Sequence, residues 1–169
     1  LAVNHCTDEV GRQKVWRELY AAELGIDSLV MDEAHAYKNS TESHEFRPAK
    51  YLALTETSTR GLDAQIKAWY VRGANEKKDG VLMLTATPIT NSPLEIYSML
   101  SLAVGAERVN NSALYCNGPD DFLNSICTIS EEECVSITGA PKNQDVFTGL
   151  QNADVLRQAV GQVVTVKLM

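Results

Sequence analysis

The stretch Ser28-Leu29-Val30-Met31-Asp32-Glu33-Ala34-His35 decides the fold. Its first half is apolar without polar alternation, which is the pattern of a short strand buried on both faces, as in a parallel sheet. Two carboxylates, Asp32 and Glu33, follow directly. Acidic side chains at the carboxyl end of such a strand lie where open α/β sheets bind their ligands. The stretch therefore predicts an α/β fold with a ligand site at this strand end.

The two adjacent carboxylates suit nucleotide hydrolysis. Because Mg²⁺ prefers one or two carboxylates together with water and phosphate oxygens, Asp32 can hold the ion. Glu33 can then orient or deprotonate the water that attacks the terminal phosphate. Asp32 is thus a candidate metal and cofactor ligand, and Glu33 a candidate cofactor ligand and base. The alternative interpretation is a strand end followed by solvated charges.

A second stretch of the same kind runs from Val81 to Pro88. Four apolar residues without alternation lead into Thr85-Ala86-Thr87, and Pro88 stops the strand. Small hydroxyl side chains such as Thr85 and Thr87 can hydrogen-bond to carboxylates on a neighbouring strand end. The sequence therefore predicts a second buried strand whose end adds to the same site.

Helices are expected between and after these strands. Leu62, Ile66 and Trp69 recur at helical spacing and predict a helix over Thr59–Arg72 that packs this face on the sheet. Strand, helix and strand form a βαβ unit, so the strands should be parallel, and the acids and threonines should come within a direct or water-mediated hydrogen bond. Ser92-Pro93-Leu94-Glu95 has the form of a capping box and predicts a further helix, which should be buried.

Local signals predict the rest of the chain. The expected elements are a helix between Thr7 and Gly25, a polar loop over Tyr37–Pro48, a helix capped by Asp120 and running to Ile126, a solvated face at Glu131–Glu133, a helix capped by Asn152 or Asp154 and ending near Gly161, and a strand over Val163–Val166.

Composition narrows the class of protein. The chain has 169 residues, of which 44% are hydrophobic, and a formal net charge of −7, which fits one globular domain. No apolar run approaches the ~20 residues that span a bilayer, and the start lacks a signal-peptide pattern, so we expect a cytoplasmic protein with no membrane partner.

The four cysteines have no metal-site spacing and are interpreted as reduced thiols, with a disulfide as the alternative. The negative charge argues against a strong electrostatic grip of this chain alone on nucleic acid.

Two motifs carry a family resemblance. Leu29 to His35 followed by Lys38 and Asn39, and the stretch Leu84-Thr-Ala-Thr-Pro-Ile-Thr-Asn with a glutamate four residues later, resemble superfamily-two DEAD/DEAH-type helicases. The Asp-Glu-Ala-His-x-x-Lys-Asn form is similar to the Swi/Snf-like branch, and more so to the helicase part of phage and plasmid methylase–helicase proteins. The resemblance covers residues 28–104 and is loose beyond them.

The resemblance implies a fold and an activity. The fold would be a partial RecA-like, P-loop NTPase-type, three-layer parallel sheet with helices on both faces, truncated. Residues 1–169 would be one fragment, the back half of the first motor lobe, with a motif-bearing core over 10–105 and a helical and loop region over 106–169. The parent protein would be an ATP-dependent DNA helicase or translocase that uses Mg²⁺ and ATP.

The resemblance also assigns roles to single residues. Asp32 matches the Mg²⁺-associated acid, Glu33 the catalytic base, and His35 the residue that links the nucleotide site to the nucleic-acid site. Thr85 and Thr87 match the motif that couples hydrolysis to movement. The adjoining Lys38 and Asn39 are candidate nucleic-acid contacts.

One element of such a motor is missing from the sequence. No Gly-x-x-x-x-Gly-Lys-Ser/Thr occurs, the loop that cradles the phosphates of ATP. We therefore expect the isolated chain to be inactive, and expect a longer parent to supply the N-terminal part of the first lobe and a second RecA-like lobe. Because the lobe would be truncated, we also expect an edge of its sheet to be exposed or to pair with a second copy of the chain. The alternatives are a catalytically inactive helicase-like interaction module and an unrelated metal-dependent hydrolase that uses Asp32, Glu33 and His35.

Overall fold

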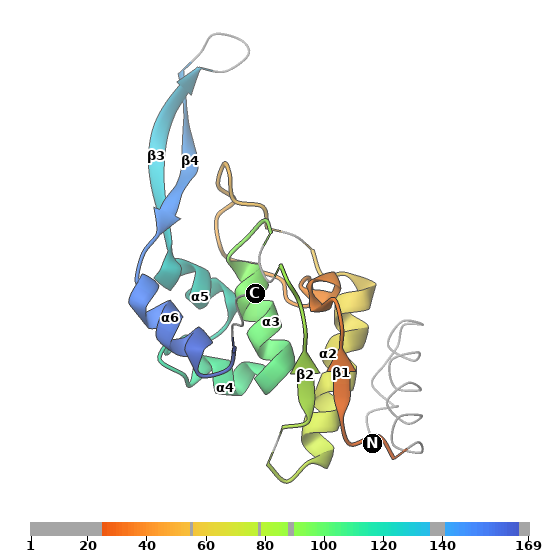
Figure 1. Ribbon diagram of the computed structural model, residues 1–169. Helices are drawn as coiled ribbons and strands as arrows, with labels where there is room; N and C mark the ends of the chain where they lie inside the picture. Colours follow the sequence, from red (N-terminus) through yellow and green to blue (C-terminus); the bar gives the residue numbers. More distant parts are fainter. Residues whose placement is uncertain (1–24, 55, 78, 88–89, 136–140, 166–169) are drawn as a thin grey trace.

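Two short strands and the helix between them form the unit that positions the candidate site in the computed structural model (Figure 1). The structure describes residues 25–54, 56–77, 79–87, 90–135 and 141–165, so the helix expected from Thr7 onward lies outside the described residues. The elements in chain order are β1 Leu29–Met31, the 3-10 helix η2 Ala34–Tyr37, α2 Thr59–Ala74, β2 Val81–Met83, α3 Leu94–Val104, α4 Ala106–Asn110, α5 Pro119–Ile126, β3 Cys127–Val135, β4 Pro141–Leu150 and α6 Ala153–Gly161.

Strands β1 and β2 are parallel, as predicted, but the prediction that they are buried is wrong for one face, since Val30 and Leu82 are exposed. Leu29 lies opposite Val81, and Met31 lies opposite Met83. The pairing continues past both strands, since the Leu84 N–H donates to the Met31 carbonyl at 2.9 Å. The α/β class is therefore confirmed, whereas a three-layer RecA-like sheet stays a prediction.

The helix α2 packs on this pair through small residues rather than large ones. Ala64 and Ala68 are buried in a cluster with Met31 of β1, whereas Trp69 is 63% exposed. The prediction that Trp69 faces the sheet is therefore wrong. A stripe of small side chains lets a helix approach close to its neighbours. With Ala64 and Ala68 on the packed side of α2, the next residue, Trp69, points away from the strands.

Gly61 marks the closest approach of α2 to the chain that follows the acids. A Cβ atom at this position would lie 2.2 Å from the carbonyl oxygen of Asn39. The same end of the helix is capped by Ser58, whose hydroxyl accepts from the Gly61 N–H at 2.9 Å. The backbone after the candidate site is thereby held against the start of α2.

A second, larger core lies around α3, α5 and α6. Its centre includes Tyr97, Phe122 and Leu123, and the rings of Tyr97 and Phe122 are 5.3 Å apart. The helices expected at 120–126 and 153–161 are confirmed as α5 and α6. Asp120 does not cap α5, however, because its carboxylate accepts from Ser43, Glu45 and Phe46 instead.

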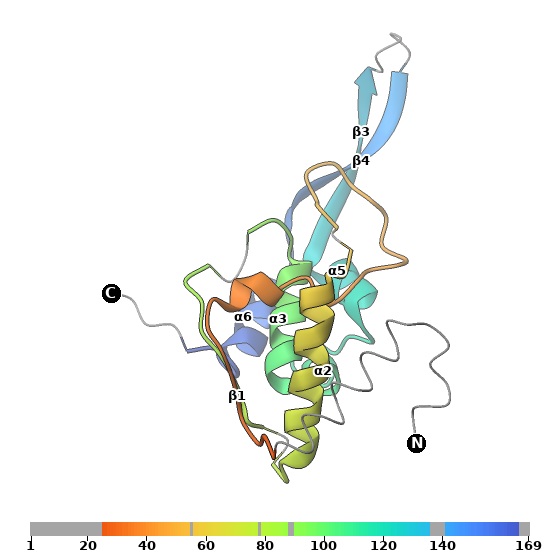
Figure 2. The same ribbon diagram turned by 90° about the vertical axis from the view of Figure 1, so that its right-hand side faces the viewer.

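The C-terminal half contains a hairpin that the sequence did not predict. Strands β3 and β4 pair antiparallel and project from the helical body as a two-stranded arm (Figure 1, Figure 2). Glu131–Glu133 are exposed as expected, and they belong to β3. The strand expected over Val163–Val166 is wrong over its described part, since the Val163 and Val164 N–H groups both bond to the Val160 carbonyl in a turn after α6.

Two cysteines in the described part of the chain are reduced thiols, as predicted. Cys116 and Cys127 are free, buried thiols, and burial raises the pKa of Cys127 to about 11, which keeps it protonated at neutral pH. Among the helices of that part, none is long and apolar enough to cross a membrane.

Candidate functional site

The carboxyl ends of β1 and β2 bring the two motifs together. The Ala34 N–H donates to the Leu84 carbonyl at 2.9 Å, one step beyond the last strand pair. Residues 32–35 and 84–87 therefore lie side by side at one edge of the sheet, as the parallel arrangement predicts.

The two carboxylates sit on a sharp turn at this edge. Asp32 is exposed, and its Oδ1 accepts from the Glu33 N–H at 2.9 Å. Glu33 adopts φ 49° and ψ 48°, the left-handed conformation, and its side chain is 70% exposed. A non-glycine residue in this conformation carries strain of about 1–3 kcal/mol, and strain of this kind concentrates at functional sites.

His35 lies between the acids and the threonines. Its Nδ1 is 3.2 Å from Glu33 Oε2 and 3.3 Å from the hydroxyl oxygen of Thr85. Because an ionised carboxylate can only accept, Glu33 selects the tautomer that carries the proton on Nδ1. The sequence predicted a direct or water-mediated hydrogen bond between the acids and the threonines. Among the described residues, the contact that joins them runs instead through the imidazole ring of His35.

The threonines are ordered among themselves. The Thr87 N–H donates to the Thr85 hydroxyl oxygen at 3.2 Å, while Thr87 itself is exposed. Thr85 thus accepts from its own loop on one side and faces His35 on the other. Its hydroxyl is the group through which the threonine pair contacts His35.

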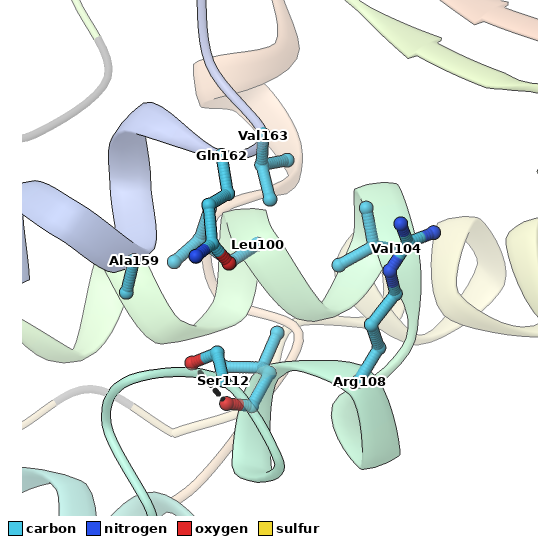
Figure 3. A pocket seen from close by; sticks show the side chains of 8 residues that line it. Leu100, Val104, Arg108, Ser112, Ala159, Gln162 and Val163 are labelled. Carbon is cyan, nitrogen blue, oxygen red and sulfur yellow. Dashed lines mark hydrogen bonds between the residues drawn. The ribbon is translucent and has the colours of Figure 1, made fainter.

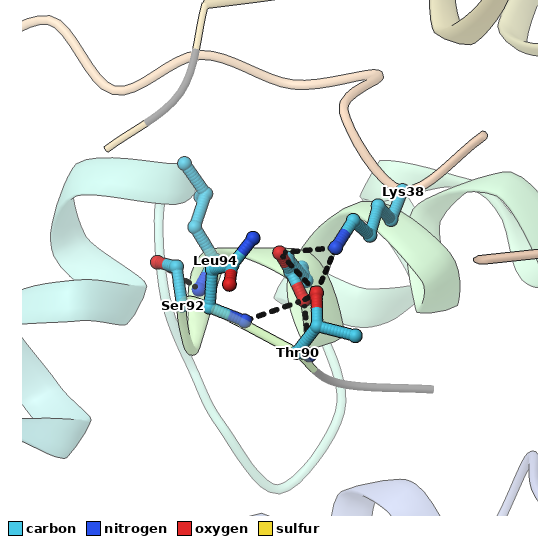
Figure 4. Close-up of polar contacts among 6 residues, drawn as sticks. Lys38, Thr90, Ser92 and Leu94 are labelled. Carbon is cyan, nitrogen blue, oxygen red and sulfur yellow. Dashed lines mark hydrogen bonds and ion pairs between the residues drawn. The ribbon is translucent and has the colours of Figure 1, made fainter. Parts of the chain in front are cut away.

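A buried ion pair joins the two motifs a few residues further along. The Lys38 ammonium lies 2.9 Å from Glu95 Oε1 and also bonds to the Thr90 hydroxyl (Figure 4). Burial alone would raise the pKa of the Glu95 carboxyl, but the bonds from Lys38 and from the Thr90 and Asn91 N–H groups lower it below the ordinary value. Lys38, a candidate nucleic-acid contact, is thus directed at Glu95.

Glu95 is a site residue that sequence reasoning missed. The sequence marked it as part of a capping box and as the glutamate that follows the second motif, without a role at the site, and the box takes a different form. The Ser92 hydroxyl accepts from the Leu94 N–H at 3.2 Å, while the Glu95 carboxylate reaches back to the Thr90 and Asn91 N–H groups. A charged residue in an otherwise apolar helix was the available signal.

The loop after the acids is anchored at several points. The Glu42 carboxylate accepts from the Thr57 N–H at 2.6 Å, and Lys50 forms a parallel bridge with Val146 of β4. Burial on its own would raise the pKa of Asp120, yet the hydrogen bonds from Ser43 and from neighbouring N–H groups lower it. The segment behind the site is therefore tied to α2, α5 and the hairpin.

A cavity in the described part of the chain lies away from these residues. It has a volume of about 60 Å³, lies between α3, α4 and the end of α6, and is lined by residues that include Leu100, Arg108 and Gln162 (Figure 3). Small-molecule pockets are usually about 300–1,000 Å³, so this space is too small for a nucleotide. No group of three His, Cys, Asp or Glu residues converges on a metal-like arrangement within the described ranges.

Comparison with known proteins changes the family assignment. The chain is 31% identical over 160 residues to the Defense against restriction protein B of Escherichia phage P1, a match that covers 94% of this chain and 7% of that protein. No family model matches, and no solved structure matches. The assignment to superfamily-two helicases, including the Swi/Snf-like and methylase–helicase branches, is therefore corrected: the relative found is a defence protein by name, and the chain spans about 7% of its length.

Proposed function

We propose that this chain is the part of an ATP-dependent DNA helicase or translocase that carries the hydrolysis and coupling groups. The observation that carries the proposal is the position of His35, whose Nδ1 lies 3.2 Å from Glu33 and 3.3 Å from Thr85. A motor needs such a link, because a change at the acid that promotes hydrolysis must reach a second segment that moves.

The acids fit their proposed roles by chemistry. Asp32 is exposed and oriented by one backbone hydrogen bond, which suits a water-mediated Mg²⁺ ligand. A bound Mg²⁺ ion would neutralise part of the negative charge of the phosphates. Glu33, exposed and held in the left-handed conformation, would accept a proton from the attacking water.

His35 would convert this proton transfer into movement. While Glu33 is ionised, it attracts the Nδ1 proton of the ring. Once Glu33 takes up a proton, that attraction weakens, and the imidazole shifts its hydrogen bond toward Thr85. The threonine segment thereby responds to the protonation state of the acid.

The architecture proposed around this site is a larger RecA-like sheet. Val30, Leu82 and Leu84 are exposed, and their positions alternate with those of the residues that pack on α2 and α3. Because parallel sheets are covered on both faces, this apolar face calls for a further layer, whereas a second copy of the chain would pair with an exposed edge of the sheet. The phosphate-binding loop and a second motor lobe would come from the rest of a longer protein.

The relative's name supplies a biological setting. That phage protein is named for defence against restriction, and we extend this setting to the present chain, acting on DNA in the cytoplasm. Contact of Lys38 and Asn39 with DNA stays a prediction.

A second candidate function is an inactive interaction module. The lack of a Gly-x-x-x-x-Gly-Lys-Ser/Thr loop in these 169 residues favours it.

The test is ATP hydrolysis by a longer protein that contains this chain and a phosphate-binding loop. We expect hydrolysis that requires Mg²⁺ and increases when DNA is added. Hydrolysis by this chain without the phosphate-binding loop, in the presence of a metal ion and without ATP, would favour a metal-dependent hydrolase. A folded protein without any hydrolysis would favour the inactive module.

A further inference from the structure

Glu95 is a buried carboxylate that the mechanism above does not use. It is 2% exposed, and its partner Lys38 is 16% exposed. Besides the ammonium at 2.9 Å, Glu95 accepts from the Thr90 N–H at 2.7 Å and the Asn91 N–H at 3.3 Å (Figure 4). The carboxylate is thus held from several directions and has a fixed orientation.

The Lys38–Glu95 pair joins the same two parts of the chain as the His35–Thr85 contact. Lys38 lies three residues after His35, and its N–H bonds to the His35 carbonyl at 3.4 Å. Glu95 holds Thr90, which lies five residues beyond Thr85. The loop after the acids and the segment after the threonines are therefore cross-linked twice, once by each pair.

Stability alone does not account for an ion pair at this place. Removing two charges from water offsets most of their attraction, so apolar residues of similar size would stabilise the fold about as well. Charge-assisted hydrogen bonds differ from apolar contacts in that they fix direction and distance. The pair therefore specifies where the two segments lie relative to each other.

We infer that Lys38 and Glu95 are positioning residues that hold the threonine segment at the distance where His35 reaches Thr85. The inference rests on the proposed function and deepens it, since the pair would transmit movement between the hydrolysis site and the second segment. Neither residue needs to touch ATP. Loss of the pair should therefore weaken coupling rather than nucleotide binding.

The test compares variants in a longer protein that contains this chain and a phosphate-binding loop. Lys38→Met and Glu95→Gln should each lower DNA-stimulated kcat by about tenfold, a typical coupling between sites. Glu95→Gln is the deciding variant, because Lys38 is also a predicted DNA contact whereas Glu95 is not. The KM for ATP should stay within about twofold, because ground-state binding is untouched. Lys38→Arg keeps the cation and should restore most of the stimulation. Lys67→Met removes an exposed pair with Asp63 on α2 and serves as the matched control.

The outcomes separate the two proposals. Wild-type stimulation that persists unchanged in folded Lys38→Met and Glu95→Gln overturns the inference alone. A wild-type protein without DNA-stimulated hydrolysis overturns the proposed function, and the inference with it. If Lys38→Met does not fold, Glu95→Gln decides, because glutamine keeps the shape and one acceptor oxygen. A lower melting temperature with unchanged stimulation would assign the pair a purely structural role and also contradicts the inference.

Discussion

The Nδ1 atom of His35 lies 3.3 Å from the hydroxyl oxygen of Thr85, fifty residues further along the chain. The same atom lies 3.2 Å from Glu33. The imidazole ring of His35 thus contacts residues of both motifs, which are far apart in the sequence. Several outcomes depend on this contact and on the elements that support it.

Thr85→Val should uncouple the two motifs. Valine keeps the branched shape but removes the hydroxyl, so His35 loses its partner on the second segment. We expect DNA-stimulated ATP hydrolysis to fall by about tenfold, with a smaller change in the basal rate. The matched control is Thr148→Val on β4, which removes an exposed hydroxyl bonded to the Thr128 carbonyl. Equal stimulation in the Thr85 variant and the control would contradict the role of this contact.

Gly61→Ala should destabilise the chain. Its new Cβ would meet the Asn39 carbonyl at 2.2 Å, so the backbone must shift, at a cost of about 1–3 kcal/mol. Gly73, in the same helix, has open space at its Cβ position, with no atom within 4 Å apart from its chain neighbours and the adjacent helix backbone. Gly73→Ala should therefore stabilise the helix by about 0.5–1 kcal/mol. Urea unfolding of the two variants measures both values, and a neutral Gly61→Ala would show that α2 does not approach Asn39 this closely.

Stability should depend on Glu95 in acid. The folded pKa of Glu95 lies below its unfolded value, so its contribution is complete at neutral pH and is lost as pH falls through the folded pKa. Urea unfolding between about pH 7 and pH 3 should show a flatter acid limb for Glu95→Gln than for the wild type. Because the pKa of Asp120 is also lowered, the stability of the wild type and of Glu95→Gln should both still fall in acid to some extent. Glu131→Gln, at an exposed position on β3, is the control, and it should follow the wild type.

The 169-residue chain by itself should bind ATP weakly. Without a phosphate-binding loop, the nucleotide has only Asp32, Glu33 and a Mg²⁺ ion to hold it. Calorimetry should detect no binding tighter than about millimolar, or ~4 kcal/mol. A micromolar dissociation constant would mean that the chain contains a nucleotide site outside the residues named here.

The sequence predicted the strand pair because its signal is local. Leu29–Met31 and Val81–Met83 are apolar runs without alternation, and each ends in polar residues that mark the strand end. Parallel pairing then followed from the intervening helix. The face of α2 was mispredicted, since helical spacing alone does not tell whether Ala64 and Ala68 or the larger Trp69 will face a closely packed neighbour.

The remaining elements depend on contacts between distant residues. The Lys38–Glu95 pair has no sequence periodicity, and only the fold brings its members together. The hairpin of β3 and β4 was missed because Glu131–Glu133 read as a solvated run, although an exposed two-stranded arm accepts charges on both faces. Asp120 has the sequence context of a helix cap, but the fold brings the loop at Ser43 to its carboxylate.

The central claim is that Glu33 acts as the base of a DNA-dependent ATP hydrolase. Glu33→Gln keeps the size of the side chain and removes its ability to accept a proton. Turnover should fall by about 10²–10⁴-fold, while Mg²⁺-dependent ATP binding persists. The direct measurement is ATP hydrolysis with DNA present, in a longer protein that contains this chain and a phosphate-binding loop, with nucleotide binding followed in parallel. Loss of turnover with retained binding is the predicted result, and unchanged turnover in Glu33→Gln would contradict the account.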